Sequence, residues 1–458
     1  MDVLKIGYNT CMSNPISQLK EKYCGKRILV VGLGLQGSGI GAVKFFSELG
    51  AAVTVTDLKN KEQLKSSIDE LKQYNVRFSL GGHKVEDFIN TDVILKGPGV
   101  RWDRPEIKAA QEKGIPIEME SALFAAFCPA PIVGITGTRG KSTTTSMIYE
   151  VLKLTGRHVH LAGNIPQVST ILLLEKIHSD DIVVMELSSF QLSGFHAYKI
   201  SPHIAVFTSF YPDHLNYYSS MDDYFHDKSA IYAYQTEKDF LIAHNSLQER
   251  IENDKPHSRV TYYSSSEFPA EFMYLRGVHN KRNAAAALHV SSLFNIPKND
   301  ADDTLKNFKN LSYRQAVVAE KNGVTFINDT TSTTPIAAVA AINSFSDKPI
   351  IHILGGNSKN LPYAELMEVL QSVEKIVLLK GSFTDEIYNE LKKRYSDKLS
   401  PVFDDLEKAI KYAYTEAKKY KETYVLFSPA ATSFAMFNNE FHRGDYFNSV
   451  VNSLIPTS

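Results

Sequence analysis

A chain of 458 residues is long enough for about three domains, and its net charge of −1 argues against a nucleic-acid-binding surface. The three cysteines, Cys11, Cys24 and Cys128, lie far apart without metal-ligand spacing, which favours reduced thiols in a cytoplasmic protein. The first residues lack the apolar segment of a signal peptide, and no apolar run approaches membrane-spanning length. We therefore expect a cytoplasmic protein that acts on small molecules, with neither nucleic acid nor membrane as a partner.

The first third of the chain carries a dinucleotide-binding pattern. Residues 1–24 show little pattern and are expected to form an extension, whereas residues 27–32 predict a strand. Gly34 and Gly37 complete G-x-G-x-x-G with the glycine that ends this strand, and Asp57 ends the next strand about 20 residues later. This arrangement is typical of a turn that holds a pyrophosphate at a helix N-terminus. By itself it favours NAD or FAD over a glycine turn that serves only close packing.

A second turn that could face a ligand is predicted after the apolar strand at residues 92–96. This strand runs into Gly97-Pro98-Gly99, and ligands of open α/β sheets bind at the carboxyl ends of the strands. Pro129 and Pro131 then favour a linker. The first domain is therefore expected to span residues 1–128.

Residues 131–150, PIVGITGTRGKSTTTSMIYE, predict a buried strand, a glycine-rich turn and a helix. In such a turn backbone N–H groups converge on phosphate oxygens, and Lys141 is expected to reach the terminal phosphates of a nucleotide. A hydroxyl of Ser142 or Thr143 is expected to hold Mg²⁺. The strict P-loop pattern is not met, because Ile135 stands where that pattern requires glycine.

Chemically useful side chains recur after the phosphate turn. Glu186 ends an apolar strand, and a carboxylate beside a phosphate loop is the usual second ligand of nucleotide-bound Mg²⁺. Asp213 and His214 follow another apolar strand, and Lys228 lies among apolar neighbours on an expected helix. Asn280 belongs to a His-Asn pair that opens an alanine-rich helix, where it is either a helix cap or a contact to a nucleotide base.

These motifs, in this order and spacing, resemble those of the Mur ligases, the ATP-dependent amide-forming ligases of peptidoglycan precursor synthesis. The resemblance rests on TGTRGKST, GNI, ELSSFQL, DH, a helical lysine and HNKRN. The wording ELSSFQL is most similar to the D-glutamate-adding members. The resemblance implies an α/β protein of three domains: a Rossmann-like UDP-substrate domain at 1–128, a P-loop-like ATPase domain with a mostly parallel sheet at 129–312, and a Rossmann-like amino-acid-binding domain at 313–458.

The resemblance also implies a reaction and its site residues. ATP would activate UDP-N-acetylmuramoyl-L-alanine as an acyl phosphate, and the amine of D-glutamate would attack it, in a protein expected to be a monomer. The implied catalytic residues are Lys141, Glu186, His214 and Lys228, with Lys228 carbamylated by CO₂ as a metal ligand. The implied Mg²⁺ ligands are Ser142, Thr143, Glu186, His214 and Lys228. The implied ATP-binding residues are Gly137, Thr138, Arg139, Gly140, Lys141, Ser142, Thr143, Asn280, Arg314 and Asp329. Those implied for the UDP substrate are Gly34, Leu35, Gln36, Gly37, Asp57, Leu58, Lys59, Gly99, Asn164 and Gln191. Those implied for the amino acid are Thr333, Lys359 and Ser433.

The last third alternates strands with helices, which predicts a third parallel sheet. Two positions depart from the family pattern: Thr331 stands in place of a lysine and Glu440 in place of a phenylalanine. Both fall where the incoming amino acid would bind, so L-glutamate or another acceptor stays open as an alternative. An NAD(P)-dependent enzyme is less favoured, because it leaves the phosphate turn and the Glu186 strand unexplained.

Overall fold

The computed structural model describes residues 14–33, 38–165, 168–215, 217–309, 311–433 and 436–454. Contacts divide the chain into two compact units. The first comprises residues 1–211, 217–268 and 282–305, and the second comprises residues 212–216, 269–281 and 306–458. In the described part of the chain, no helix has the length and apolar character needed to cross a membrane.

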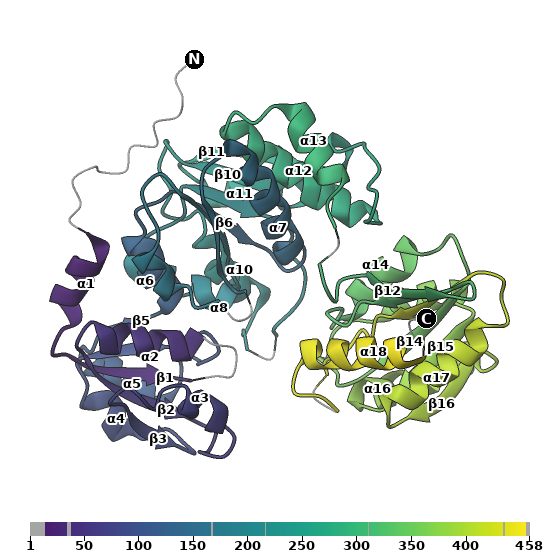
Figure 1. Ribbon diagram of the computed structural model, residues 1–458, viewed down its shortest axis with the longest axis horizontal. Helices are drawn as coiled ribbons and strands as arrows, with labels where there is room; N and C mark the ends of the chain where they lie inside the picture. The colour runs from purple at the N-terminus through teal and green to yellow at the C-terminus, as the bar shows by residue number, and fades with distance from the viewer. Residues whose placement is uncertain are drawn as a thin grey trace. The chain divides into compact units, whose positions relative to one another are not determined.

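The first unit contains two parallel sheets (Figure 1). The first sheet has the order β3-β2-β1-β4-β5, with β1 Arg27–Val31, β2 Ala52–Asp57, β3 Arg77–Leu80, β4 Val93–Lys96 and β5 Ile117–Glu118. Its helices are α1 Pro15–Tyr23, α2 Ser38–Glu48, α3 Lys65–Asp69, α4 Val85–Ile89, α5 Pro105–Glu112 and α6 Glu120–Phe127. A doubly wound sheet of this kind places the ends of β1, β2 and β4 on one edge.

The expectation of an extension before the first strand is wrong for its described part. Residues 15–23 form α1, in which Leu19 and Tyr23 are fully buried in the core of the first unit. The Tyr23 ring packs edge-on against Phe46 at 5.0 Å between centroids. The Tyr23 hydroxyl also donates a hydrogen bond to Glu118. The apolar residues of α1 therefore belong to the hydrophobic core of the first unit.

The second sheet has the order β11-β10-β9-β6-β8-β7. Its strands are β6 Ile132–Thr136, β7 Val159–Gly163, β8 Ile182–Glu186, β9 Ile204–Phe207, β10 Phe240–His244 and β11 Arg259–Tyr263, all paired in parallel. The accompanying helices are α7 Lys141–Leu152, η1 Lys153–Thr155, η2 Ile171–Glu175, α8 Ser189–Leu192, α9 Phe195–Tyr198, α10 Met221–Ser229, η3 Asn245–Leu247, α11 Gln248–Asp254, η4 Ser265–Glu267, α12 Val278–Leu293 and α13 Lys298–Lys306. β6 and β8 are buried along their whole length, which explains their continuous apolar sequences.

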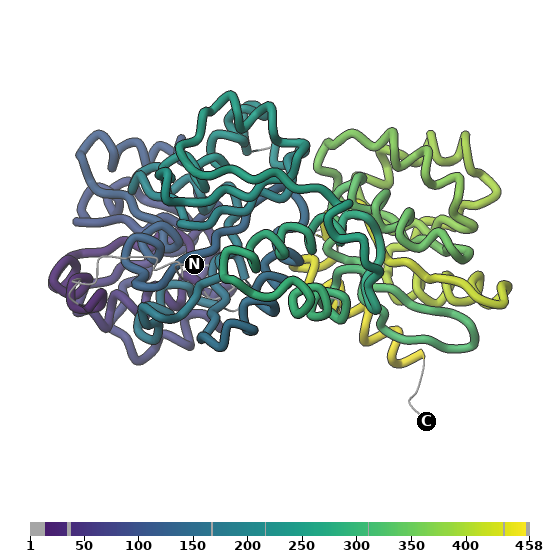
Figure 2. The backbone as a smooth tube through the Cα atoms, turned by 90° about the horizontal axis from the view of Figure 1, so that it is seen from above, coloured from purple at the N-terminus to yellow at the C-terminus, as the bar shows by residue number. Residues whose placement is uncertain are grey.

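The third sheet lies in the second unit, with the order β12-β13-β17-β14-β15-β16. Its strands are β12 Ala316–Lys321, β13 Val324–Asn328, β14 Ile350–Gly355, β15 Lys375–Leu379, β16 Leu399–Phe403 and β17 Thr423–Phe427. Its helices are α14 Pro335–Ser344, α15 Ala364–Val369, η5 Leu370–Ser372, α16 Ser382–Tyr395, α17 Leu406–Ala417 and α18 Glu440–Leu454. Separate apolar clusters pack α14, α15 and α16 on one face of the sheet and α17 and α18 on the other. Figure 2 traces this part of the backbone, green to yellow, as one compact body.

The third sheet is mixed, and the prediction of a purely parallel one is corrected. β12 pairs antiparallel with β13, while the other described strands of the sheet pair in parallel. The two-residue connection is Asn322-Gly323, and both residues have positive φ, 52° and 76°. Asn-Gly in this conformation matches the right-handed twist of a hairpin. The prediction of an α/β fold of three domains, with a sheet in each, is confirmed.

Candidate active site

The phosphate turn joins the buried strand β6 to helix α7, and its two glycines have positive φ. Gly137 has φ 147° and Gly140 has φ 86°. A Cβ atom on Gly137 would lie 2.1 Å from Thr208 Oγ1, and one on Gly140 would lie 2.6 Å from Asn283 Oδ1. Neither position can therefore hold a side chain without displacing its neighbour.

The neighbouring strand β9 fixes the shape of this turn. Thr138 N donates to Ser209 O over 2.8 Å, and Arg139 N donates to Ser209 Oγ over 2.9 Å. The hydroxyls of Thr208 and Ser209 both donate to Arg139 O, over 2.6 and 3.0 Å. Thr138 Oγ1 accepts from Tyr211 N at 3.0 Å. The turn is thus held from outside by backbone and hydroxyl groups at the exit of β9.

Two lysine side chains meet at the phosphate turn. Lys141 Nζ donates to Gly137 O over 2.9 Å, and Lys228 Nζ donates to the same oxygen over 3.0 Å. Lys228 is only 1% exposed, and its amine lies 4.7 Å from the centre of the Tyr224 ring. The amines are at most about 6 Å apart, because each is one hydrogen-bond length from one oxygen. Two cations at this separation repel, so a bound anion is favoured there.

Glu186 lies at the end of β8, next to the strand that leads into the phosphate turn. Ile135 on β6 is its register partner, and Glu186 is 3% exposed. Asn164 donates its side-chain amide to Glu186 Oε1 over 3.0 Å and its backbone N–H to Glu186 O over 2.8 Å. The sheet therefore places this carboxylate and the turn on the same edge. Ser142 and Thr143 lie half-buried in the first turn of α7.

Asn283 lies beside the phosphate turn, and sequence reasoning left it without a role. Thr144 Oγ1 donates to Asn283 Oδ1 over 3.2 Å, and the same oxygen lies where a Cβ on Gly140 would be. This contact ties α12 to the start of α7. The HNKRN motif contained the signal, because its second Asn is one helical turn from Asn280 on the same helix face.

The predicted UDP-substrate residues divide into described and undescribed ones. Gly34, Leu35, Gln36 and Gly37 lie outside the described residues. Asp57 accepts hydrogen bonds from the N–H groups of Leu33 at 2.9 Å and Lys59 at 2.9 Å. Its carboxylate thus braces the end of β1 against the end of β2. Leu58 is 59% exposed, and Gly99 is exposed in the turn after β4.

The Gln191 side chain makes hydrogen bonds within the first unit. Together with Ser188 it forms a capping box at the start of α8, and its Nε2 donates to Ser121 Oγ over 3.0 Å. The ELSSFQL motif therefore carries a helix cap as well as Glu186.

Lys96 at the end of β4 is a buried cation that the sequence analysis missed. It is 1% exposed, donates to Val100 O over 2.8 Å and lies 4.5 Å from the centre of the Trp102 ring. Burial lowers the pKa of Lys96 to about 8. It follows three apolar residues at the carboxyl end of a central strand, and that position was its only sequence signal.

The second unit holds the other predicted residues. Lys359 Nζ lies 3.4 Å from Thr333 Oγ1 and 3.4 Å from Asp213 Oδ1. His214 has positive φ, 56°, and its N–H donates to Asp213 Oδ1 over 2.9 Å. Three of the predicted residues and Asp213 therefore form one polar group. The Asn280 side-chain amide donates to Arg276 O over 2.7 Å, and Ser433, six residues after the end of β17, is 3% exposed.

Asp329 directly follows β13. Arg314 is half-buried and lies close enough to Asp329 to interact with it electrostatically. Ser428 Oγ donates to Asp329 Oδ2 over 2.8 Å, and Gln315 N donates to Oδ1 over 3.1 Å. Burial raises the pKa of Asp329 to about 7, against these hydrogen bonds and the Arg314 charge, which lower it. The carboxyl group is thus poised to change its charge near neutral pH.

Comparison with known proteins places the chain among ligases of the same three-part organisation. It matches the Mur ligase MurD-like N-terminal domain at residues 26–118, the Mur ligase middle domain at 135–296 and the Mur ligase glutamate ligase domain at 313–431. A UDP-N-acetylmuramoylalanine–D-glutamate ligase of Roseiflexus sp. is 34% identical, over 94% of this chain and 99% of its own length. The chain belongs to the Mur ligase family. A protein of the same description from Borreliella burgdorferi is 35% identical, over 93% of this chain and 97% of its own.

Solved Mur ligase structures share the fold. The UDP-N-acetylmuramate–alanine ligase of Thermotoga maritima matches with a TM-score of 0.60 at 18% identity, over 94% of this chain and all of its own. The MurF ligase of the same organism, solved with ADP, matches with a TM-score of 0.58 at 16% identity, over 97% of this chain and all of its own.

In this Mur ligase the two departures from the family pattern have defined surroundings. Thr331 Oγ1 donates to Tyr313 O over 2.9 Å, and Glu440 O accepts from Thr330 Oγ1 at 3.0 Å at the start of α18. The sequence analysis missed Arg443, which is 1% exposed and donates to Thr330 O over 2.7 Å and Ala431 O over 3.2 Å. Burial lowers the pKa of Arg443 to about 10, so the side chain stays positive at neutral pH.

Proposed function

We propose that this Mur ligase uses ATP to join D-glutamate to UDP-N-acetylmuramoyl-L-alanine, forming an amide bond, ADP and phosphate in peptidoglycan precursor synthesis. Relatives that match nearly the whole chain carry the name of this activity. The observation that supports ATP-driven activation most strongly is the meeting of Lys141 and Lys228 at Gly137 O, 2.9 and 3.0 Å away.

The chemistry requires positive charge at this position. A carboxylate and an ammonium do not condense at neutral pH, so the carboxylate must first receive the γ-phosphoryl group. Both reactants are anionic, and their approach is unfavourable unless cations surround the transferred group. Lys141 and the N–H groups of the turn would bind the phosphates, while the glycines leave room for them. The amine of D-glutamate then attacks the acyl phosphate and phosphate leaves.

The side chains present fit Mg²⁺, which prefers oxygen ligands. Glu186 offers a carboxylate, with one oxygen fixed by the Asn164 amide, and Ser142 or Thr143 offers a hydroxyl in the first turn of α7. Bound there, Mg²⁺ would neutralise charge that develops on the phosphate oxygens. Among these residues, Asn164 orients the carboxylate and the β6–β8 pairing keeps it beside the turn. His214 is the remaining proposed ligand.

We assign Lys228 a carbamate in the active enzyme. The Lys228 ammonium first releases one proton, and addition of CO₂ to the neutral amine then forms an N–C bond and releases a second proton. The two steps together turn a cation into an anion. This change would remove the repulsion between Lys228 and Lys141 and supply two further oxygens for metal binding. The carbamate nitrogen keeps one N–H, so a hydrogen bond to Gly137 O remains available.

The remaining roles follow the three sheets. Residues 1–128 are proposed to bind UDP through residues 34–37, Asp57, Leu58, Lys59 and Gly99. Asn164, which follows β7, and Gln191 on α8 are proposed to bind the same substrate. Residues 129–312 are proposed to bind ATP with Asn280, and residues 313–458 to add Arg314 and Asp329. Thr333, Lys359 and Ser433 are proposed to bind D-glutamate. ATP and UDP-sugars are cytoplasmic metabolites, so we place the enzyme in the cytoplasm, and we propose that it acts as a monomer.

The deciding experiment measures phosphate release from ATP with UDP-N-acetylmuramoyl-L-alanine and a series of amino acids. We expect release that depends on both the nucleotide substrate and D-glutamate. L-glutamate is the second candidate, because Thr331 and Glu440 alter the charge near the amino-acid site. Higher kcat/KM with L-glutamate or with a neutral amino acid would refute the proposed acceptor while leaving the ligase reaction intact.

A further inference from the structure

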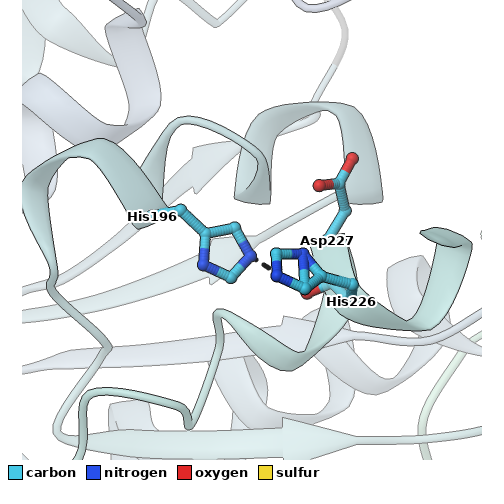
Figure 3. A group of neighbouring side chains, drawn as sticks. All are labelled: His196, His226 and Asp227. Atoms are coloured by element: carbon cyan, nitrogen blue, oxygen red, sulfur yellow. Dashed lines mark hydrogen bonds between the residues drawn. The ribbon is translucent and has the colours of Figure 1, made fainter. Parts of the chain in front are cut away.

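A cluster of two imidazoles and one carboxylate lies on the first unit, outside the phosphate turn. His196 on α9 and His226 and Asp227 on α10 each offer one ligand atom, and these atoms lie within 4.8 Å of one another (Figure 3). We propose that His196, His226 and Asp227 form a binding site for a divalent transition metal of the zinc class. The site shares no residue with the ligands that we propose for Mg²⁺.

The two imidazoles are already arranged against one another. Their rings stack at 4.3 Å between centroids, with 29° between planes. Figure 3 shows the two rings side by side. His196 Nε2 donates to His226 O over 3.0 Å, because a carbonyl can only accept. His226 is exposed, so its ring can change rotamer and approach an ion without disturbing the core.

Tyr234 can fix the orientation of the His196 ring through a hydrogen bond to the ring nitrogen that does not bind the metal. Its hydroxyl lies 2.7 Å from His196 Nδ1. A histidine that binds metal through one ring nitrogen usually donates the other N–H to an oxygen, which fixes ring orientation. On metal binding the ring proton of His196 moves from Nε2 to Nδ1, and the Nδ1–H then donates a hydrogen bond to Tyr234 Oη. His196 Nε2 gives up its hydrogen bond to the His226 carbonyl and binds the ion instead. Asp227 is oriented in turn by Tyr218, whose hydroxyl donates to Asp227 Oδ2 over 3.0 Å.

The ligand set selects the class of ion. Two imidazole nitrogens and one carboxylate suit Zn²⁺, Co²⁺ or Ni²⁺, whereas Mg²⁺ prefers an all-oxygen set. Ligand atoms bonded to one Zn²⁺ at about 2 Å lie at most about 4 Å apart. The cluster must therefore contract slightly, which a rotation of the exposed His226 side chain accomplishes. Water would complete the coordination on the exposed side.

A bound ion would lie next in sequence to Lys228 and would connect two helices. Asp227 directly precedes Lys228, whose amine donates to Gly137 O of the phosphate turn. An ion held by His196, His226 and Asp227 would link α9 to the last turn of α10. Binding of the ion only to the folded chain would raise thermal stability, as any ligand of the native state does.

The test uses the full-length protein, freed of metal with a chelator and then titrated with Co²⁺ in saturating Mg²⁺. We expect one equivalent of Co²⁺ to bind, with the visible absorption of a nitrogen-containing site and an increase in Tm. His226→Ala and Asp227→Asn should each weaken Co²⁺ binding by about tenfold or more, and Tyr234→Phe by about tenfold. His257→Ala, which removes an exposed imidazole elsewhere in the first unit, should leave binding unchanged.

A second control distinguishes this cluster from the magnesium ligands. Glu186→Gln should retain Co²⁺ binding and its spectrum if the ion occupies the His196 cluster. The proposal is overturned if Glu186→Gln abolishes binding while His226→Ala does not. It is equally overturned if the wild-type protein shows neither a Co²⁺ spectrum nor a Tm increase.

Discussion

Lys228 Nζ and Gly137 O are joined by a hydrogen bond of 3.0 Å that spans 91 positions of sequence. This bond brings a side chain from α10 to the turn that Lys141 also contacts. Lys228 thereby adds a positive charge from a distant part of the sequence to those of Arg139 and Lys141. The same bond gives Lys228 a fixed direction, so any modification of its amine occurs beside the phosphate turn.

The carbamate assigned to Lys228 makes activity depend on dissolved CO₂. Ligation measured in CO₂-depleted buffer should fall severalfold and return when bicarbonate is added. Lys228→Ala should be inactive and insensitive to bicarbonate. A high-resolution density map that showed an unmodified ammonium in a fully active enzyme would contradict the assignment.

Replacing Lys141 or Glu186 tests the phosphate turn. Lys141→Ala and Glu186→Ala should each lower phosphate release by several orders of magnitude. Lys141 supplies positive charge to the transferred group, and Glu186 is a proposed ligand of the Mg²⁺ that would supply more. Binding of the UDP substrate, measured separately by calorimetry, should persist. Lys153→Ala is the matched control, because Lys153 is an exposed cation that immediately follows α7. Unchanged phosphate release in Lys141→Ala would remove the basis of the assignment.

The first sheet should recognise a UDP-sugar rather than a nicotinamide nucleotide. Since a ligand that binds only the native state raises its stability, UDP-N-acetylmuramoyl-L-alanine should increase Tm, and NAD(H) or NADP(H) should not. Asp57→Ala should reduce the increase, because Asp57 braces the N–H groups of Leu33 and Lys59. Stabilisation by NADH alone would reverse the interpretation.

Asp329 should make stability decrease as the pH rises toward neutrality. Burial raises its pKa to about 7, whereas an aspartate in an unfolded chain titrates near about 3.9. Between these values the folded state holds a proton that the unfolded state has released, so the stabilising contribution is full below about pH 4 and is lost as pH approaches 7. Thermal unfolding of Asp329→Asn across this window should show a flatter dependence than wild type. An identical pH profile for both proteins would count against the buried neutral carboxyl group.

His352, which also contacts Ser428, should make stability depend on pH in the opposite direction. It is fully buried and donates through Nε2 to Ser428 O over 2.7 Å, and burial lowers its pKa to about 4. Its stabilising contribution is present above about pH 6.5, the unfolded value, and is lost as the pH falls toward 4. His352→Gln should therefore reduce acid sensitivity, whereas Asp329→Asn should reduce sensitivity on the neutral side.

The amino-acid site should bind D-glutamate weakly. Thr331 stands in place of the lysine that the family resemblance implies. Loss of one charge-assisted hydrogen bond costs about 1.5–3 kcal/mol, which is about ten- to a hundredfold in affinity. Thr331→Lys should therefore lower KM for D-glutamate by about tenfold or more, with less change in kcat. Thr415→Lys, which adds the same charge at an exposed position of α17, should have no effect. A KM that Thr331→Lys leaves unchanged would show that this position does not face the substrate.

Local patterns were sufficient to predict the strand, turn and helix around residues 136–141 and the strand that Glu186 ends. The strand, turn and helix of residues 131–150 are continuous in sequence, and Glu186 ends an apolar strand. The pattern of apolar residues therefore predicted the positions of the turn and of Glu186. The same local information also contained two signals that were missed. Asn322-Gly323 predicts the antiparallel hairpin of β12 and β13, and Leu19 with Tyr23 indicates the buried face of α1.

Tertiary structure alone decided which distant side chains meet. Strand order places β9 and β8 on either side of β6, so Thr208 and Ser209 shape the phosphate turn and Glu186 lies beside it. No periodicity in the sequence specifies that Lys228 reaches Gly137 O, or that Arg443 lies buried against Thr330. Such contacts depend on how whole elements pack, because packing brings together residues whose separation along the chain carries no information about their distance.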